Sequence, residues 1–267
     1  DPPNMPGDPP KEKPDFRTSR GYETGVMSFF RGCNALITGA SSGFGAEFAR
    51  QLAPEAASLI LVARRMDRLE ALKRELARPG LTIHCMKADL SSTRDIESLC
   101  LQVEVEEMPL DLLINNAGLG DHGRFDTSDW KKVEAMLSVN ITALTLLTYR
   151  LLPLLRKNPK GSILNVSSVA SLLPMPKMAV YAATKAYVTS FSEALRAELR
   201  TSGVRVCALC PGPVSTEFGT VAERAGEEDP VPAPELMKVP LQTAVKAGLD
   251  ALAANRPRVI PGLLVRL

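Results

Sequence analysis

The stretch Ala35-Leu-Ile-Thr-Gly-Ala-Ser-Ser-Gly-Phe-Gly45 decides how the rest of the chain is interpreted. Its first four residues form a short β-forming run, and the pattern from Ala46 to Leu52 is typical of a helix. Glycines between a strand and a helix let the backbone turn tightly and approach a pyrophosphate, whose charge meets the free N–H groups of the helix. The stretch therefore predicts a dinucleotide site, with an ordinary tight turn as the alternative.

The alternation of short apolar runs and longer amphipathic segments continues to the end of the chain. Strands are predicted at 35–38, 58–63, 82–87, 110–115, 162–167, 205–209 and 258–260, and helices at about 43–53, 66–77, 93–105, 129–155, 179–201 and 240–254. Continuous apolar strands separated by helices indicate an α/β, doubly wound (Rossmann) fold: a parallel sheet of about seven strands with helices on both faces. Its ligand is expected at the carboxyl ends of the strands.

Composition divides the chain into a tail and one domain. Residues 1–25 are rich in proline and charge and poor in large apolar groups, so they cannot bury enough surface to offset their ordering entropy. We predict a disordered tail at 1–25 and a single domain at 26–267. Within the domain, prolines and glycines interrupt helical periodicity at about 217–237, which predicts a mobile lid over a substrate.

Charge and hydropathy argue against several classes of protein. The 32 basic and 30 acidic residues are interspersed, so no stripe for nucleic acid is expected. No apolar stretch reaches the roughly 18 residues of a membrane span, and the N-terminus has no signal-peptide pattern. The apolar end at 259–267 is interpreted as a docking segment, with peripheral membrane contact as one alternative and the stub of a longer chain as another.

The five cysteines are odd in number and scattered, which predicts a reducing, cytoplasmic location rather than a disulfide framework. Cys207 and Cys210 lie inside an apolar run, and no second Cys/His pair stands at zinc spacing. We therefore expect buried structural thiols and no metal.

A second stretch, Tyr181-Ala-Ala-Thr-Lys185, places a phenol and an ammonium on the same face of a predicted helix. A nearby cation favours phenolate, so the pKa of Tyr181 is expected to fall below its reference value of about 10. Tyr181 is thus a candidate acid/base. Taken alone, such a pair is more often two surface residues of a helix.

The glycine spacing is Gly-x-x-x-Gly-x-Gly, and further motifs follow in order: Asp89-Leu90, Asn115-Asn-Ala-Gly118, Asn140, Ser168, the Tyr181 stretch and Pro211-Gly-Pro-Val-Ser-Thr216. With these motifs the chain, from about 32 to 261, resembles the short-chain dehydrogenase/reductase (SDR) family. The resemblance implies a catalytic set of Asn140, Ser168, Tyr181 and Lys185. Ser167 is the alternative to Ser168, because it is one residue away and faces the opposite side if the strand continues.

The resemblance also implies the cofactor contacts. These are expected from Thr38, Gly39, Ser41, Ser42, Gly43, Phe44, Gly45, Arg64, Arg65, Asp89, Leu90, Asn116, Ala117, Gly118, Tyr181, Lys185, Pro211, Gly212, Val214 and Thr216. After the second strand, the position where an NAD enzyme usually has an acidic residue is Ala63, followed by two arginines. We predict NADP(H), with Arg64 as the main contact of the 2′-phosphate and Arg65 as a lesser one. A solvated basic pair is the alternative.

The function implied is that of a carbonyl reductase: an oxidoreductase that moves hydride between NADPH and a ketone, aldehyde or 3-oxoacyl-type substrate, in the reducing direction. Tyr181 would give the proton, Ser168 polarise the oxygen, Lys185 hold the ribose, and Asn140 anchor a water. Apolar residues after Ser168 and in the lid favour an apolar small-molecule substrate. The family resemblance implies a homodimer or homotetramer. A catalytically silent NADP(H)-binding regulator is the alternative function.

Overall fold

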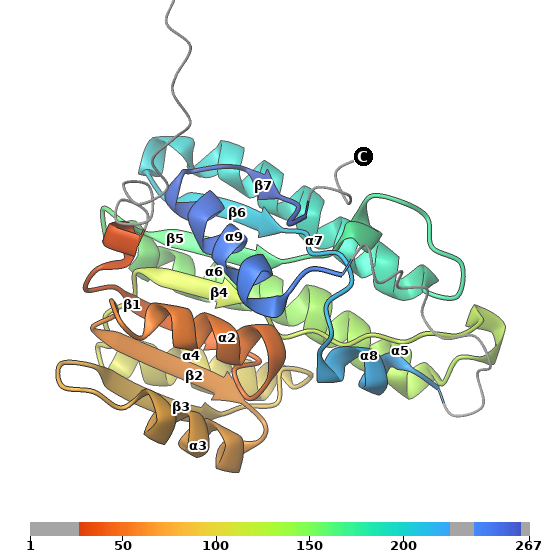
Figure 1. The fold of residues 1–267 in the computed structure, drawn as a ribbon, viewed down its shortest axis with the longest axis horizontal. Helices are drawn as coiled ribbons and strands as arrows, with labels where there is room; N and C mark the ends of the chain where they lie inside the picture. The colour runs from red at the N-terminus through yellow and green to blue at the C-terminus, as the bar shows by residue number, and fades with distance from the viewer. Residues whose placement is uncertain (1–26, 225–237, 263–267) are drawn as a thin grey trace, which may run out of the picture.

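The computed structural model describes residues 27–224 and 238–262 (Figure 1). The predicted tail at 1–25, the larger part of the predicted lid and residues 263–267 of the predicted docking segment lie outside this part of the chain.

The centre of the fold is a seven-stranded, all-parallel sheet, as the sequence predicts. Its strands run in the order β3-β2-β1-β4-β5-β6-β7. They are β1 (Asn34–Thr38), β2 (Ser58–Ala63), β3 (Thr82–Lys87), β4 (Leu112–Asn115), β5 (Ser162–Val166), β6 (Arg205–Leu209) and β7 (Arg258–Val259). The order reverses between β1 and β4, so the crevice for a ligand lies at the carboxyl ends of these two strands.

Helices cover both faces of the sheet (Figure 1). They are α2 (Gly43–Leu52), α3 (Met66–Leu76), α4 (Thr93–Val105), α5 (Trp130–Leu137), the π-helical η3 (Ser138–Ala143), α6 (Leu144–Arg156), α7 (Ala179–Glu198), α8 (Glu217–Ala222) and α9 (Leu241–Ala253), with short 3₁₀ turns η1 (Ser28–Phe30), η2 (Phe125–Thr127), η4 (Val169–Ser171) and η5 (Leu199–Ser202). The single helix predicted at 129–155 thus contains a π-helical segment in its middle.

The beginning of the predicted lid is helical, which the sequence interpretation missed. Phe218 and Ala222 are four residues apart in α8, so both side chains lie on one face. That face packs on Gly120, where an added Cβ would lie 2.6 Å from the Phe218 ring and 3.0 Å from Ala222 Cβ. The missing side chain at Gly120 therefore lets α8 pack closely on this loop.

Successive residues of the strands point to opposite faces of the sheet and so belong to two separate hydrophobic cores. Ile37 and Leu61 point to the face covered by α2, α3 and α9, whereas Leu36 and Ile60 point to the face covered by α4 and α6. Every position of β2, β4 and β5 is buried, so these strands carry largely continuous apolar runs instead of alternating ones.

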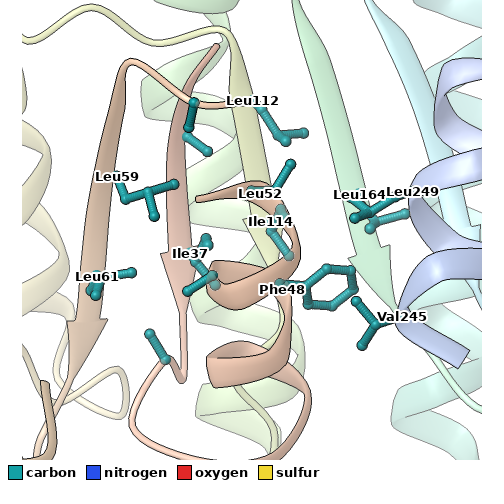
Figure 2. Close-up of a cluster of buried hydrophobic side chains, with 14 of the residues drawn as sticks. Ile37, Phe48, Leu52, Leu59, Leu61, Leu112, Ile114, Leu164, Val245 and Leu249 are labelled. Atoms are coloured by element: carbon teal, nitrogen blue, oxygen red, sulfur yellow. The ribbon is translucent and has the colours of Figure 1, made fainter. Parts of the chain in front are cut away.

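Phe48 of α2 is a fully buried member of the first core. Figure 2 shows its ring between α2 and α9, beside Val245 and near Ile114. The ring therefore joins the glycine-turn helix to the C-terminal helix across the middle of the sheet.

The helical stretch from Trp130 to Arg156 is long and apolar enough to cross a membrane by length and composition. Core helices pass the same test, and the buried side of this stretch packs on the sheet through residues such as Val139, Leu147 and Leu151. Its other side exposes Trp130 and Tyr149, the latter 74% exposed. The predicted homo-oligomer stays a prediction, and these side chains are available to it.

The cysteines are free thiols, four of them buried and Cys85 half-buried, as predicted. Among residues 27–224 and 238–262, no group of three or more His, Cys, Asp or Glu side chains is placed to hold a metal.

Replacement of Phe48 by alanine removes a fully buried ring, so we expect the free energy of unfolding to fall by about 3–5 kcal/mol. Urea unfolding followed by circular dichroism measures the loss. The matched control is Leu101→Ala, because Leu101 is 55% exposed and should change stability by no more than about 0.5 kcal/mol. Equal effects of the two substitutions would contradict the packing described.

Candidate active site

The glycine turn after β1 has its shape because no side chain stands at two of its positions. Gly39 has a φ of +65°, and an added Cβ would lie 2.9 Å from Nδ2 of Asn116. At Gly45 an added Cβ would lie 2.3 Å from the Gly39 carbonyl oxygen. Both glycines thus allow α2 to approach the ends of β1 and β4, which leaves the backbone of the turn open to a ligand.

Thr38 joins this turn to the turn that follows β4. Its Oγ1 accepts hydrogen bonds of 3.0 Å from the backbone N–H groups of Asn116 and Ala117, and Asn116 Nδ2 donates to the Thr38 carbonyl at 2.8 Å. Thr38 is 1% exposed and lies behind the wall of the cleft. Thr38 thus links the turn after β1 to the turn after β4.

Asn140 lies in the π-helical segment and uses its side chain to hold the protein together. Oδ1 accepts from the Leu119 N–H at 2.8 Å, while Nδ2 donates to the Leu119 carbonyl at 2.9 Å and to Thr184 Oγ1 at 3.0 Å. Thr184 in turn donates to the Tyr181 carbonyl at 2.7 Å. Both N–H donors of the amide are thus used within the protein, so they are not available to a water.

Tyr181, Lys185 and Ser168 come together at the bottom of the cleft. Tyr181 and Lys185 are 7% and 4% exposed, and the Lys185 Nζ lies 5.8 Å from the centroid of the Tyr181 ring. Nζ donates to the Val166 carbonyl at 2.9 Å, and Ser168 forms a hydrogen bond with the Tyr181 side chain. The α8 residue Phe218 covers the phenol, with the two ring centroids 5.6 Å apart.

Burial dominates the titration of this cluster. It raises the pKa of Tyr181 to about 12, and the hydrogen bond with Ser168 lowers that value only in part. Burial also lowers the pKa of Lys185 to about 8, because an ammonium loses hydration there. The prediction that the pKa of Tyr181 falls is therefore wrong. The Lys185 ammonium donates its hydrogen bond to the Val166 carbonyl, and a phenolate at this buried position would not be hydrated.

Ser167 and Ser168 have different surroundings. Ser167 is 2% exposed, and its Oγ donates to the Lys185 carbonyl at 2.9 Å and pairs with Thr189 at 2.7 Å. Ser168 follows the end of β5, and its Oγ accepts from the Ala170 N–H at 3.1 Å. Ser168 is thus the serine beside the phenol.

The two arginines after β2 are placed differently. The Arg65 guanidinium donates to Ser41 Oγ at 3.1 and 3.2 Å and to Ser42 Oγ at 2.8 Å. Arg64 is exposed and acts through its charge on Asp89, whose pKa is lowered first by the Ser91 N–H and also by Arg64. Arg65, rather than Arg64, therefore lies with the serine hydroxyls of the glycine turn.

A single cleft of about 680 Å³ connects these groups. Of the predicted site residues it is lined by Gly39, Ser41, Ser42, Gly43, Phe44, Arg64, Arg65, Asp89, Leu90, Asn116, Ala117, Gly118, Ser168, Tyr181, Lys185, Pro211, Gly212, Val214 and Thr216. Thr38, Gly45 and Asn140 lie behind its wall. The sequence interpretation did not identify Glu217, which lines the cleft and pairs with Arg68; the i, i+3 spacing of Arg65 and Arg68 on α3 was the available signal.

The segment that follows the C-terminal end of α8 is held by an ion pair between Arg224 and Asp121, which was not predicted. Arg224 donates to both carboxylate oxygens of Asp121 and to Ser128 Oγ, the Nε contact being 2.9 Å long. The neighbouring His122 is 2% exposed, and its backbone N–H donates to the Ala222 carbonyl at 2.8 Å.

Residues 33–226 match the model of the family described as short chain dehydrogenase. A sulfoacetaldehyde reductase of Chromohalobacter salexigens is 38% identical over 198 residues, which cover 72% of this chain and 76% of the relative. Among solved structures, a short-chain dehydrogenase from Sphingobium yanoikuyae in complex with NADPH is 33% identical, with a TM-score of 0.78 over 86% of this chain and 88% of that one. The bulky-bulky ketone specific alcohol dehydrogenase from Comamonas testosteroni is 30% identical, with a TM-score of 0.73 over 86% of each chain.

The lowered pKa of Lys185 predicts a pH-dependent difference in stability. Between about pH 8 and the ordinary lysine value of 10.5, the unfolded chain binds a proton that the folded chain lacks. Rising pH therefore removes a penalty that is fully present below pH 8. Relative to Lys185→Met, the wild type should gain free energy of unfolding across this window.

Urea unfolding of both proteins at the two ends of the window measures this gain. The exposed Lys132→Met variant controls for loss of a positive charge. A constant difference between wild type and Lys185→Met would show that the ammonium is not held in a dehydrated site.

Proposed function

The chain belongs to the short-chain dehydrogenase family, and we propose that it is a carbonyl reductase that uses NADPH and an apolar ketone or aldehyde. The observation that carries this proposal is the meeting of the Tyr181 phenol, the Ser168 hydroxyl and the Lys185 ammonium beside the glycine turn, in one cleft.

The residues of the cleft fit a dinucleotide. The side chain missing at Gly39 leaves the backbone of the glycine turn accessible, and a cleft of about 680 Å³ falls in the ordinary range for bound cofactors. Solved relatives contain NADPH, NADP⁺ or NAD, so the choice for this chain depends on its own side chains. Arg65 with the hydroxyls of Ser41 and Ser42 is a donor set that suits a phosphate, which supports NADP(H).

Bound NADPH would supply the hydride to the carbonyl carbon. A phenol with a pKa of about 12 stays protonated at neutral pH, so Tyr181 can give its proton to the carbonyl oxygen as reduction requires. Ser168 can donate a hydrogen bond to the same oxygen as negative charge develops there. The Lys185 ammonium, 5.8 Å from the ring centroid, stabilises the tyrosinate that is left until solvent returns the proton.

The surroundings of Tyr181 support an apolar substrate. The apolar side chains that pack in one cluster with Tyr181 and also line the cleft include Ala170, Met175, Met178 and Phe218. Burial of apolar substituents against these side chains would favour binding of a ketone or aldehyde that carries them.

Tyr181→Phe removes the proton donor and leaves the ring. We expect the rate of NADPH oxidation with a panel of apolar carbonyl compounds to fall by at least about a hundredfold, while NADPH binding measured by fluorescence persists. The matched control is Tyr187→Phe on the same helix, whose hydroxyl contacts Thr145 away from the cleft. Equal rates for wild type and Tyr181→Phe would reject the mechanism. Tight NADPH binding without turnover by any panel member would favour a catalytically silent regulator.

Arg65→Gln removes the charge beside Ser41 and Ser42. We expect the dissociation constant of NADPH to rise about tenfold or more, since a charge-assisted hydrogen bond to the 2′-phosphate is lost, with little change for NADH. Arg64→Gln is the matched variant and should have the smaller effect. Equal losses for NADPH and NADH in Arg65→Gln would show that this arginine does not contact the 2′-phosphate.

A further inference from the structure

Glu217, the first residue of α8, forms ion pairs with two arginines of the opposite wall. Its carboxylate accepts from one terminal nitrogen of Arg68 at 2.7 and 2.9 Å and from one terminal nitrogen of Arg65 at 3.2 Å. Hydrogen bonds from Arg68 and then Arg65 lower the pKa of Glu217, which keeps it ionised at neutral pH. The start of α8 is thus fixed to α3 by charge.

The Arg65 guanidinium donates hydrogen bonds to two groups of acceptors. Its Nε and one terminal nitrogen face Ser41 and Ser42, and its other terminal nitrogen faces Glu217. A phosphate placed on Arg65 and these hydroxyls would have the Glu217 carboxylate as a neighbour on the same guanidinium. Carboxylate and phosphate oxygens use the same fork of N–H donors and repel one another.

The ion pairs of Glu217 are suited to being exchanged. The side chains of Arg65, Arg68 and Glu217 are 42%, 43% and 53% exposed. Ion pairs at such exposure are individually weak, and a phosphate dianion carries more charge than the carboxylate it would replace. Displacement of Glu217 would also release the Arg68 guanidinium, which shares the Glu217 carboxylate with Arg65.

We propose that Glu217 is an internal competitor for the 2′-phosphate site. In this arrangement the carboxylate occupies Arg65 and Arg68 until a 2′-phosphate replaces it, and Arg68 then becomes a second phosphate ligand. A nucleotide without a 2′-phosphate leaves the ion pairs intact. Glu217 therefore reduces the preference for NADP(H) over NAD(H). This inference rests on the proposed use of NADP(H).

Glu217 is also the neighbour of a residue at the reaction centre. Phe218 follows Glu217 directly in α8 and covers the Tyr181 ring at a centroid distance of 5.6 Å. The ion pairs of Glu217 therefore hold the residue that precedes Phe218, while the ion pair of Arg224 with Asp121 holds the segment after α8.

The test measures binding of two probes to the full chain by titration calorimetry: adenosine 2′,5′-bisphosphate, which has the 2′-phosphate, and adenosine 5′-monophosphate, which lacks it. For Glu217→Gln we expect the affinity for the bisphosphate to rise about three- to tenfold at low salt, a gain that shrinks as salt screens the charges. Affinity for the monophosphate should not change. Arg68→Gln should weaken bisphosphate binding alone.

Glu198→Gln is the matched control, because it removes the same charge from an exposed position at the end of α7 that does not line the cleft. An equal gain in this control, or a Glu217→Gln variant whose bisphosphate affinity is unchanged or lower, would overturn the competition while leaving the proposed function intact. Failure of wild type and Glu217→Gln to bind either the bisphosphate or NADPH would instead overturn the proposed NADP(H) use, and this inference with it.

Discussion

The close approach of α2 to the ends of β1 and β4 is the constraint on which the cleft depends. At Gly45 even a methyl group would lie 2.3 Å from the Gly39 carbonyl oxygen, so the helix can reach this position only without a side chain. The approach brings Asn116 against Thr38, and the hydrogen bonds between them align two turns that are far apart in sequence. Phe48 then anchors the helix in the core (Figure 2). One packing contact thus sets the floor of the site, the direction of α2 and the position of the turn after β4.

The second determinant of the site is the loss of hydration on burial, which shifts the pKa values of two groups in opposite directions. It raises the pKa of the Tyr181 phenol to about 12 and lowers that of the Lys185 ammonium to about 8. Both shifts favour the neutral form of each group, which is the expected response to burial. The polar contacts of Lys185 and Asn140 are made largely with main-chain groups at Val166 and Leu119. The protein therefore keeps these side chains in place by backbone geometry, which local side-chain substitutions leave unchanged.

The sequence predicted the features that depend on local pattern and on motif spacing. The parallel sheet and the strand positions belong to this group, because apolar runs and glycine turns report directly on the backbone. The meeting of Tyr181 with Ser168 was implied by the resemblance to the family. The sequence did not predict the pKa of Tyr181, since burial is a property of the whole fold. It also did not predict the short helix α8, whose packing joins Phe218 to Gly120, about a hundred residues away in the sequence.

The position of α8 shows how a short helix can be held over a reaction centre without a large core of its own. A helix of six residues has little intrinsic stability, so its position must come from tertiary contacts. Those contacts are of two kinds: the apolar face formed by Phe218 and Ala222 packs on Gly120, and ion pairs hold the flanking segments to α3 and to Asp121. The pair at Asp121 is buried and the pair at Arg68 is exposed, so the two ends differ in how readily they open. An anion that reaches the exposed end would compete only with Glu217 for the two arginines. The end of α8 that begins with Glu217 is therefore the end at which a bound anion can change the contacts of the cleft.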